Sequence, residues 1–225
     1  MKIKGLLIVS LVVAAAMAGF AFYAASLLPP GARLPTHWGP TGAPDRFADA
    51  LPALLMPAGI LLFIALLFAI IPYIEPLQDR LEGSQPLLRT VWIGTLVLLP
   101  VVEIFNAAPA FGWRQPNSVR LITVGLLLIL FGNALPKSRP GFFVGIRTPW
   151  TITDTDNWIA THRLGGKLMV TGGAVIAASA LLPFEPRFRV VLFFAAIAAM
   201  VVPPFVYSWW FWRRKKKAGQ ATGWQ

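Results

Sequence analysis

The stretch GLLIVSLVVAAAMAGFAFYAASLL, residues 5–28, decides the fold class of this chain. It contains no charged residue and is longer than the about 20 apolar residues that a helix needs to cross a bilayer. Lys2 and Lys4 precede it, so a signal peptide cleaved in the alanine-rich stretch 14–18 is one interpretation. The apolar run exceeds the about 7–15 residues of a signal-peptide core, which favours an uncleaved membrane anchor.

The composition of the whole chain indicates a membrane protein. Of its 225 residues, 56% are hydrophobic and only 13% are charged, and the mean hydropathy is +0.66. That charged share is about half of the share usual in a soluble domain. The chain has no cysteine, which excludes disulfides and thiol chemistry.

The net charge of +11 does not indicate nucleic-acid binding, because no folded basic module carries it. A basic run, residues 213–217, directly follows the aromatic stretch SWWFW at residues 208–212. Aromatic residues followed by a basic cluster are typical of the cytoplasmic end of a span, and such clusters attract anionic lipid. The partner that this pattern predicts is the lipid bilayer, with no direct binding of nucleic acid.

Hydropathy predicts six membrane-spanning helices. They are expected at residues 5–28, 52–72, 91–111, 119–135, 167–183 and 188–212. Most of the 20 Lys and Arg residues fall in segments on the same side as the N-terminus, and these residues favour the cytoplasmic side. The sequence therefore predicts an all-α integral membrane protein with six transmembrane helices and both termini in the cytoplasm.

Two membrane units and a tail are expected along the chain. The N-terminal unit is a two-helix module with an extracytoplasmic loop, and the second unit is a four-helix region with a cytoplasmic loop. The expected ranges are 1–75 with its loop at 29–51, 76–217 with its loop at 136–166, and a disordered tail at 218–225.

The outer loop is rich in proline and glycine, which predicts a stiff backbone of irregular shape. His37 and Trp38 place an imidazole beside an interfacial aromatic ring, and Asp45 and Asp49 follow. A metal site of His37 with the two aspartates is one interpretation. It is disfavoured because zinc sites usually have more nitrogen or sulfur ligands, so we expect these groups to bind loop backbone and Arg46 instead and predict no metal.

The inner loop ends in a short helix that precedes the fifth span. Thr153, with Asp156 three positions later, resembles the start of a capped helix. Within that helix Trp158 and His162 are i,i+4 neighbours and share a face. From the residues alone, the loop is interpreted as a segment that aromatic and basic residues anchor at the membrane interface.

Polar residues inside the spans are a second candidate site. Glu103 lies well inside the third span, Asn106 shares its face, and Asn133 in the fourth span is a candidate partner. An ionisable residue at this depth is costly, so it indicates a polar pocket or a proton-linked path. Hydrogen bonding between helices is the alternative. In the fifth span Gly173 and Ala177 lie on a small-residue face that favours close helix packing.

The two loops also resemble known membrane proteins. LPTHWGPTGAPDRF, residues 34–47, is similar to an N-terminal membrane module of unknown function that often precedes SdpI-type regions. GNALPKSRPGFFVGIRTPWTITDTDNWIATHRLGGKL, residues 132–168, resembles the signature region of the SdpI family. The positions that match that signature are Asn133, Pro136, Gly145, Arg147, Thr148, Pro149, Trp150, Trp158, Thr161, His162 and Arg163.

The resemblance implies a bacterial inner-membrane protein. The sequence contains no cofactor motif, and we expect no cofactor and no enzymatic activity. The best known member of the SdpI family is an immunity protein that protects the producing cell from a secreted peptide toxin, and when the toxin is present it also holds a transcriptional repressor at the membrane. Our hypothesis is that the outer loop meets the toxin and the inner loop signals. The expected ligand or partner residues are His37, Trp38, Asp45, Arg147, Thr148, Pro149, Trp150, Trp158, His162 and Arg163.

Three other function classes remain as alternatives. A small-solute or proton-linked transporter or channel would use Glu103 and Asn106, although no inverted repeat is evident between the halves of the chain. A membrane enzyme is disfavoured, because the two histidines are expected on opposite faces and form no acid–base pair. A membrane scaffold would need only partner proteins or lipid.

Overall fold

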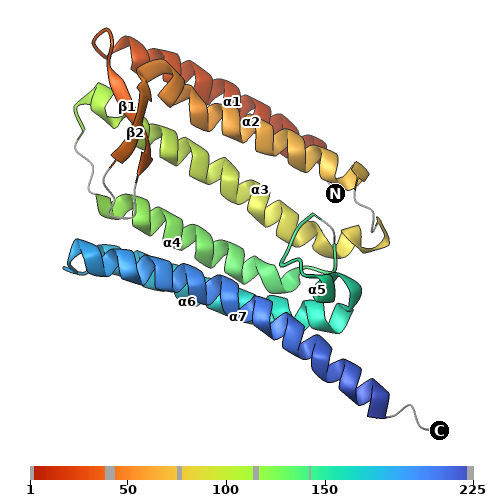
Figure 1. Cartoon of the computed structure of the whole chain (residues 1–225). Helices are drawn as coiled ribbons and strands as arrows, with labels where there is room; N and C mark the ends of the chain where they lie inside the picture. The colour runs from red at the N-terminus through yellow and green to blue at the C-terminus, as the bar shows by residue number, and fades with distance from the viewer. Residues whose placement is uncertain (1–2, 39–43, 75–77, 114–116, 142, 222–225) are drawn as a thin grey trace.

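The computed structural model describes residues 3–38, 44–74, 78–113, 117–141 and 143–221 and is mostly helical (Figure 1). Its elements, in chain order, are α1 (Ile3–Ser26), β1 (Arg33–Trp38), β2 (Pro44–Asp49), α2 (Ala50–Ile74), α3 (Gln78–Ala107), η1 (Ala108–Phe111), α4 (Asn117–Ala134), η2 (Leu135–Lys137), α5 (Pro149–Thr153), α6 (Thr155–Leu181) and α7 (Pro186–Ala221).

Six of the helices are long and apolar enough to cross a membrane, which confirms the six predicted spans. They cover Ile3–Ser26, Ala50–Ile74, Gln85–Phe111, Ser118–Lys137, Thr155–Leu181 and Pro186–Lys217. Large apolar side chains such as Phe22 and Phe63 are more than half exposed. Exposure on this scale fits a surface that faces lipid, where an apolar side chain needs no burial inside the protein.

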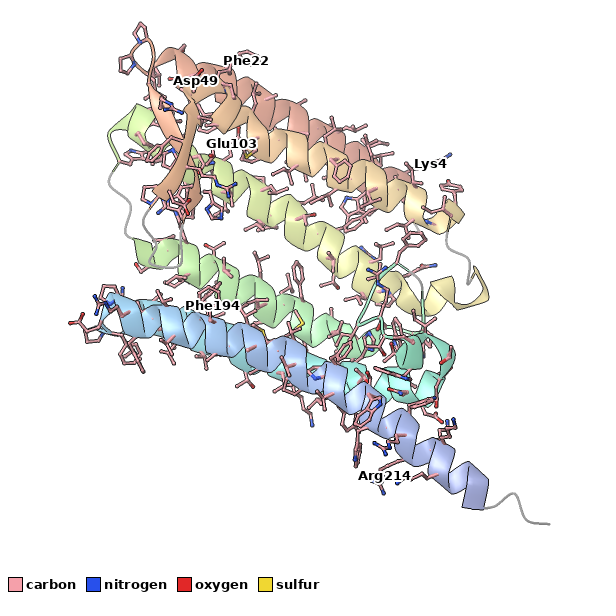
Figure 2. The ribbon with its side chains drawn as sticks, viewed as in Figure 1. Lys4, Phe22, Asp49, Glu103, Phe194 and Arg214 are labelled. Atoms are coloured by element: carbon pink, nitrogen blue, oxygen red, sulfur yellow. The ribbon has the colours of Figure 1, made fainter. Side chains whose placement is uncertain are left out.

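The helices run side by side from α1 and α2 through α3 and α4 to α6 and α7 (Figure 1). The β1–β2 hairpin lies at one end of the bundle, which we name the hairpin end. The segment 143–154 with α5 lies at the other end, the loop end, together with the start of α1 and the end of α7. Figure 2 accordingly shows Asp49 at the hairpin end and Lys4 and Arg214 at the loop end.

A small antiparallel hairpin forms where an irregular outer loop in an all-α fold was expected, so that prediction was wrong. Strands β1 and β2 pair from Arg33 with Asp49 to Trp38 with Pro44, with irregular register between. Prolines are tolerated here because both strands of a two-stranded sheet are edges. Leu34 is buried against α1 and α2 and anchors the hairpin on the bundle.

Helices α4 and α6 pack backbone to backbone at two pairs of glycines. A Cβ atom on Gly125 would lie 2.5 Å from the carbonyl oxygen of Gly173, and one on Gly132 would lie 2.8 Å from that of Gly166. A Cβ on Gly125 would also lie 2.8 Å from Cβ of Ala177. The predicted small-residue face of the fifth span is therefore confirmed as a site of close helix packing.

Helix α6 is one continuous helix from Thr155 to Leu181. The expected break between a short helix and a fifth span beginning near residue 167 was wrong. Gly165 and Gly166 do not end the helix; they are buried, and Gly166 lets the backbone of α4 approach. The cap was also misplaced, because the residue that precedes the first turn of α6 is Asp154, one position after Thr153.

Candidate functional site

The loop end is built around a buried pair of threonines that begins α5. The backbone N–H of Thr148 donates to Oγ1 of Thr151 at 2.9 Å, and that of Thr151 donates to Oγ1 of Thr148 at 3.1 Å. This reciprocal arrangement is a capping box, and Pro149 at the first helical position supports it. Oγ1 of Thr148 also donates to Oγ of Ser208 at 3.1 Å, which ties α5 to α7.

The same serine connects α7 to α6. Nδ2 of Asn157 donates to the carbonyl oxygen of Ser208 at 2.8 Å, and Oγ1 of Thr161 donates to Oδ1 of Asn157 at 3.0 Å. All three residues are fully buried. Sequence reasoning missed Asn157 and Ser208; the signal available was a lone serine in the aromatic run of the last span.

Trp158 and His162 stack on each other, with ring centroids 4.0 Å apart and an interplanar angle of 17°, which confirms that they are neighbours on one face. Nε1 of Trp158 donates to Oγ of Ser138 at 3.1 Å. Nε2 of His162 accepts from the backbone N–H of Ile146 at 2.8 Å, so its other nitrogen, 2.8 Å from the carbonyl oxygen of Trp158, carries the proton. His162 thus holds the loop in place as a neutral imidazole.

The loop approaches these rings so closely that only glycine fits at residue 145. Gly145 has φ 126°, in the region that disfavours other residues, and a Cβ there would lie 2.6 Å from Nε2 of His162. The match of Gly145 to the family signature therefore has a steric reason. The described residues of the segment 138–163 thus form one hydrogen-bonded unit.

The predicted loop-end residues separate into two groups. Thr148, Trp158 and His162 are buried and cannot touch a large partner. Three others are exposed on the surface of the loop end, namely Arg147, Pro149 and Arg163. Trp150 lies between the two groups, half-buried, with its ring 5.8 Å from that of Phe205 and 6.2 Å from that of Trp212.

The end of α7 adds a basic and aromatic surface beside this group. Cationic groups of the basic run lie over indole rings. The guanidinium of Arg213 is 5.2 Å from the ring centroid of Trp209, and that of Arg214 is 4.7 Å from the centroid of Trp210. The ammonium group of Lys216 lies over Trp212 in the same way. Nζ of Lys215 instead forms ion pairs at 2.9 Å with both Asp154 and Asp156. The tail is thereby attached to the first turn of α6.

Asp154 combines two roles that substitution can separate. Its Oδ1 accepts from the backbone N–H of Asp156 at 2.9 Å and of Asn157 at 3.3 Å, and it pairs with Lys215. Burial raises the pKa of Asp154, but the hydrogen bonds from Lys215 and from the two backbone groups outweigh burial and hold this pKa below its usual range. The carboxylate form is therefore the one that stabilises the fold.

We expect Asp154→Ala to lower the free energy of unfolding by about 1 kcal/mol through the lost cap. Asp154→Asn should cost only a few tenths of a kcal/mol, because asparagine caps as well and the lost ion pair is exposed. Since the pKa is lowered on folding, the ion-pair contribution is present above a pH of about 4 and disappears as the pH falls further. Thermal unfolding of the three proteins across pH checks this; a gap between wild type and Asp154→Asn that does not narrow as the pH falls below about 4 would contradict it.

The hairpin end holds the second candidate site, a cavity of about 610 Å³. Its wall comes from β1, α3, α4 and α7 and is mainly apolar, with aromatic side chains Trp38, Phe105, Phe193 and Phe194. Its polar lining consists of Thr36, His37, Asn106, Arg120 and Thr123. The guanidinium of Arg120 lies 4.4 Å from the ring centroid of Trp38, so the hairpin and the start of α4 meet at this cavity.

The hairpin residues do not converge on a metal site. Nδ1 of His37 lies 2.6 Å from Oδ1 of Asp45, whereas Asp49 faces Arg33 at 4.0 Å. In the described ranges no group of three His, Cys, Asp or Glu side chains could hold a metal ion. His37 and Trp38 line the cavity. Asp45 does not line it, but its carboxyl group contacts the ring of His37.

Glu103 and Asn106 are buried on one face of α3, with exposed fractions of 1% and 6%. Within the described part of the chain, Oε1 of Glu103 and Oδ1 of Asn106 have no hydrogen-bond partner. Asn106 lines the cavity. Asn133 is exposed near the opposite end of α4, so the structure does not bring it to Glu103.

Comparison with known proteins identifies the loop end. Residues 137–208 match the SdpI/YfhL protein family. The chain is also 23% identical over 150 residues to "Immunity protein SdpI" of Bacillus subtilis (strain 168), which covers 65% of this chain and 72% of that protein. No solved structure matches the chain.

The family match coincides with the buried network. It begins beside Ser138, which accepts from Trp158, and it ends at Ser208, which joins α5, α6 and α7. The six apolar helices make the chain a multi-pass membrane protein. Residues 137–208 of this membrane protein are therefore the part that is similar to the SdpI/YfhL protein family.

Proposed function

We propose that this chain is an SdpI-like immunity protein of the bacterial inner membrane that gives resistance to a secreted peptide toxin. The observation that carries the proposal is the similarity to an immunity protein over 150 residues. The whole buried network of the loop end lies inside the family match. A unit kept by so many buried hydrogen bonds supports a specific role for its surface.

Orientation follows from charge in this proposal. The loop end carries the basic run of α7 and exposed Arg147 and Arg163, so it faces the cytoplasm. The hairpin end then faces outward, where a secreted peptide arrives. The two predicted membrane units would meet at residues 75–77, which lie outside the described residues.

Each end of the bundle then has its own task. The cavity with His37 and Trp38 is the place for a toxin, and the surface of Arg147, Pro149 and Trp150 is the place for a cytoplasmic partner such as a repressor. Helix α7 reaches both places, because Phe193 and Phe194 line the cavity and Ser208 belongs to the buried network. Movement of this helix is the route by which occupancy at one end would be sensed at the other.

The test is survival of a sensitive bacterium that expresses the protein during challenge with a panel of membrane-active peptides. We expect protection by the wild type and its loss, to the level of an empty vector, in Arg147→Ala and Trp150→Ala, with membrane levels unchanged. These two side chains are exposed or half-buried, so their loss removes surface rather than the buried network. Arg89→Ala, an exposed arginine outside the family match, is the control and should protect fully.

Protection that is unchanged in both loop-end variants would contradict a need for this surface in immunity. A wild type that protects against no peptide would contradict immunity itself. In that case transport becomes the stronger proposal, because Glu103 is buried and its Oε1 has no hydrogen-bond partner among the described residues.

A further inference from the structure

The cavity at the hairpin end contains a buried hydrogen-bond acceptor without a partner. Asn106 is 94% shielded from solvent, it lines the cavity, and its Oδ1 meets no donor in the described part of the chain. A buried acceptor left unpaired destabilises a protein, so most native structures satisfy such groups. This oxygen therefore indicates a ligand that brings a donor into the cavity.

Glu103, about one helical turn away on α3, also has a buried acceptor without a partner in the described ranges. Its Oε1 is also buried and unpaired within the described residues, and three positions along α3 place the two side chains on one face. Figure 2 shows Glu103 in the half of α3 nearer the hairpin, and Phe194 on the part of α7 that faces the same end. Of the two residues, Asn106 lines the cavity and Glu103 does not, so the acceptor offered to a ligand is that of Asn106.

The rest of the cavity sets the size and character of the ligand. Its volume of about 610 Å³ lies in the range of about 300–1,000 Å³ that is usual for sites of small ligands. Phe105, Phe193 and Phe194 provide apolar walls, and the hairpin forms part of the wall with His37 and Trp38. An apolar ligand of the size of a few amino-acid residues fits this cavity better than a sugar or a free ion.

We infer that the cavity binds an apolar peptide segment whose backbone N–H donates a hydrogen bond to Asn106. A lipid acyl chain would fill the apolar volume equally well, but it carries no donor and would leave the amide oxygen unpaired. A peptide backbone carries one donor per residue, and its N–H groups are costly in an apolar environment unless an acceptor is provided. A bound peptide would therefore pair its N–H donor with the otherwise unpaired acceptor of Asn106.

This inference rests on the proposed function for the origin of the peptide, because an immunity protein would bind a segment of the toxin. It adds the place of binding, the bond that recognises the backbone, and the prediction that recognition depends little on side-chain identity. Binding at a cavity shared by β1, α3, α4 and α7 would also bring the two halves of the bundle together.

The test measures binding of dansyl-Leu-Val-Phe-Leu-amide to the purified full chain in phospholipid nanodiscs, by fluorescence. A second probe is the same peptide with N-methylated backbone amides, which has the apolar groups but lacks the donors. We expect N-methylation to weaken binding to the wild type about tenfold, the effect of one buried hydrogen bond. In Asn106→Leu the two probes should bind equally, because the acceptor is absent.

Two further variants separate loss of the site from loss of folding. Val102→Trp fills the cavity and should abolish binding of the unmethylated probe, whereas Ile104→Trp, at an exposed position of the same helix, should bind as the wild type does. Overturning results are an equal effect of N-methylation in wild type and Asn106→Leu, or binding unaffected by Val102→Trp. Dansyl-undecanoic acid that binds the wild type more tightly than the unmethylated peptide does, and that loses binding in Val102→Trp, would assign the cavity to lipid and would also overturn the inference.

The binding result and the survival result can fail independently. If the cavity binds the peptide as expected while the cell is not protected from any toxin, the peptide site is supported and the immunity function is contradicted. If the wild type protects the cell and Asn106→Leu and Val102→Trp protect equally well, the immunity function is supported and the role of the cavity in binding the toxin is contradicted.

Discussion

Gly173→Leu is expected to leave almost no folded protein in the membrane. A Cβ at this position would lie 2.5 Å from the carbonyl oxygen of Gly125, 2.9 Å from Cβ of Leu128 and 3.0 Å from the backbone nitrogen of Ile129. These are atoms of the facing backbone and of a Cβ, which cannot rotate away. Helices α4 and α6 would have to separate, and the cost would exceed the about 1–3 kcal/mol of ordinary overpacking.

Fluorescence-detected size-exclusion chromatography of detergent extracts, together with the membrane level of the protein, checks this expectation. Gly19→Leu is the matched control, because a Cβ on that helical glycine of α1 would meet nothing within 4 Å. Gly173→Ala should fall between the two, since the Cβ alone already collides. A Gly173→Leu protein with the elution profile and thermal stability of the wild type would show that α4 and α6 do not pack as described.

The spans and the face shared by Trp158 and His162 were predictable from the sequence because both depend on local spacing. An uncharged run of sufficient length makes a span wherever it occurs, and residues four apart on a helix are neighbours whatever surrounds them. Gly173 on a small-residue face was predictable for the same reason. Its partner Gly125 on α4 was not, because that contact depends on how two helices meet.

The errors concern contacts between distant parts of the chain. The outer loop was expected to be irregular from its prolines and glycines, yet Arg33 pairs with Asp49 across the loop. Ser208, which holds the loop end together, lies 60 residues from Thr148 and 51 from Asn157. A polar residue in an apolar run gives no sign of which distant group it bonds.

The start of α6 was misplaced because Gly165 and Gly166 were treated as a boundary. Their helix propensity is low, but the close approach of α4 at Gly166 requires the absence of a side chain. Tertiary packing therefore overrode the local preference. Packing also explains why the residues that match the family signature include buried ones such as Trp158 and His162.

The second large effect is expected at His162, the side chain that fixes the loop to α6. His162→Phe retains a ring that can stack on Trp158, but it removes the acceptor that pairs with the backbone N–H of Ile146. That N–H would remain buried without a partner, which costs about 1–3 kcal/mol. The loop around Gly145 should then open locally, since its other contacts do not replace this bond.

Hydrogen–deuterium exchange of the segment 143–151 is the direct measurement. We expect exchange there to be about tenfold faster or more in His162→Phe, with α1 and α2 unchanged, and protection of cells to be lost. Gly145→Ala should open the same segment from the opposite side, because its Cβ would press on the same nitrogen at 2.6 Å. Arg163→Phe, at the neighbouring exposed position, controls for the introduction of a phenyl group and should leave exchange unchanged. Unaltered exchange in both His162→Phe and Gly145→Ala would mean that the stacked rings do not fix the loop. The hydrogen bonds of Thr148, Thr151 and Ser208 would then have to hold the loop end alone.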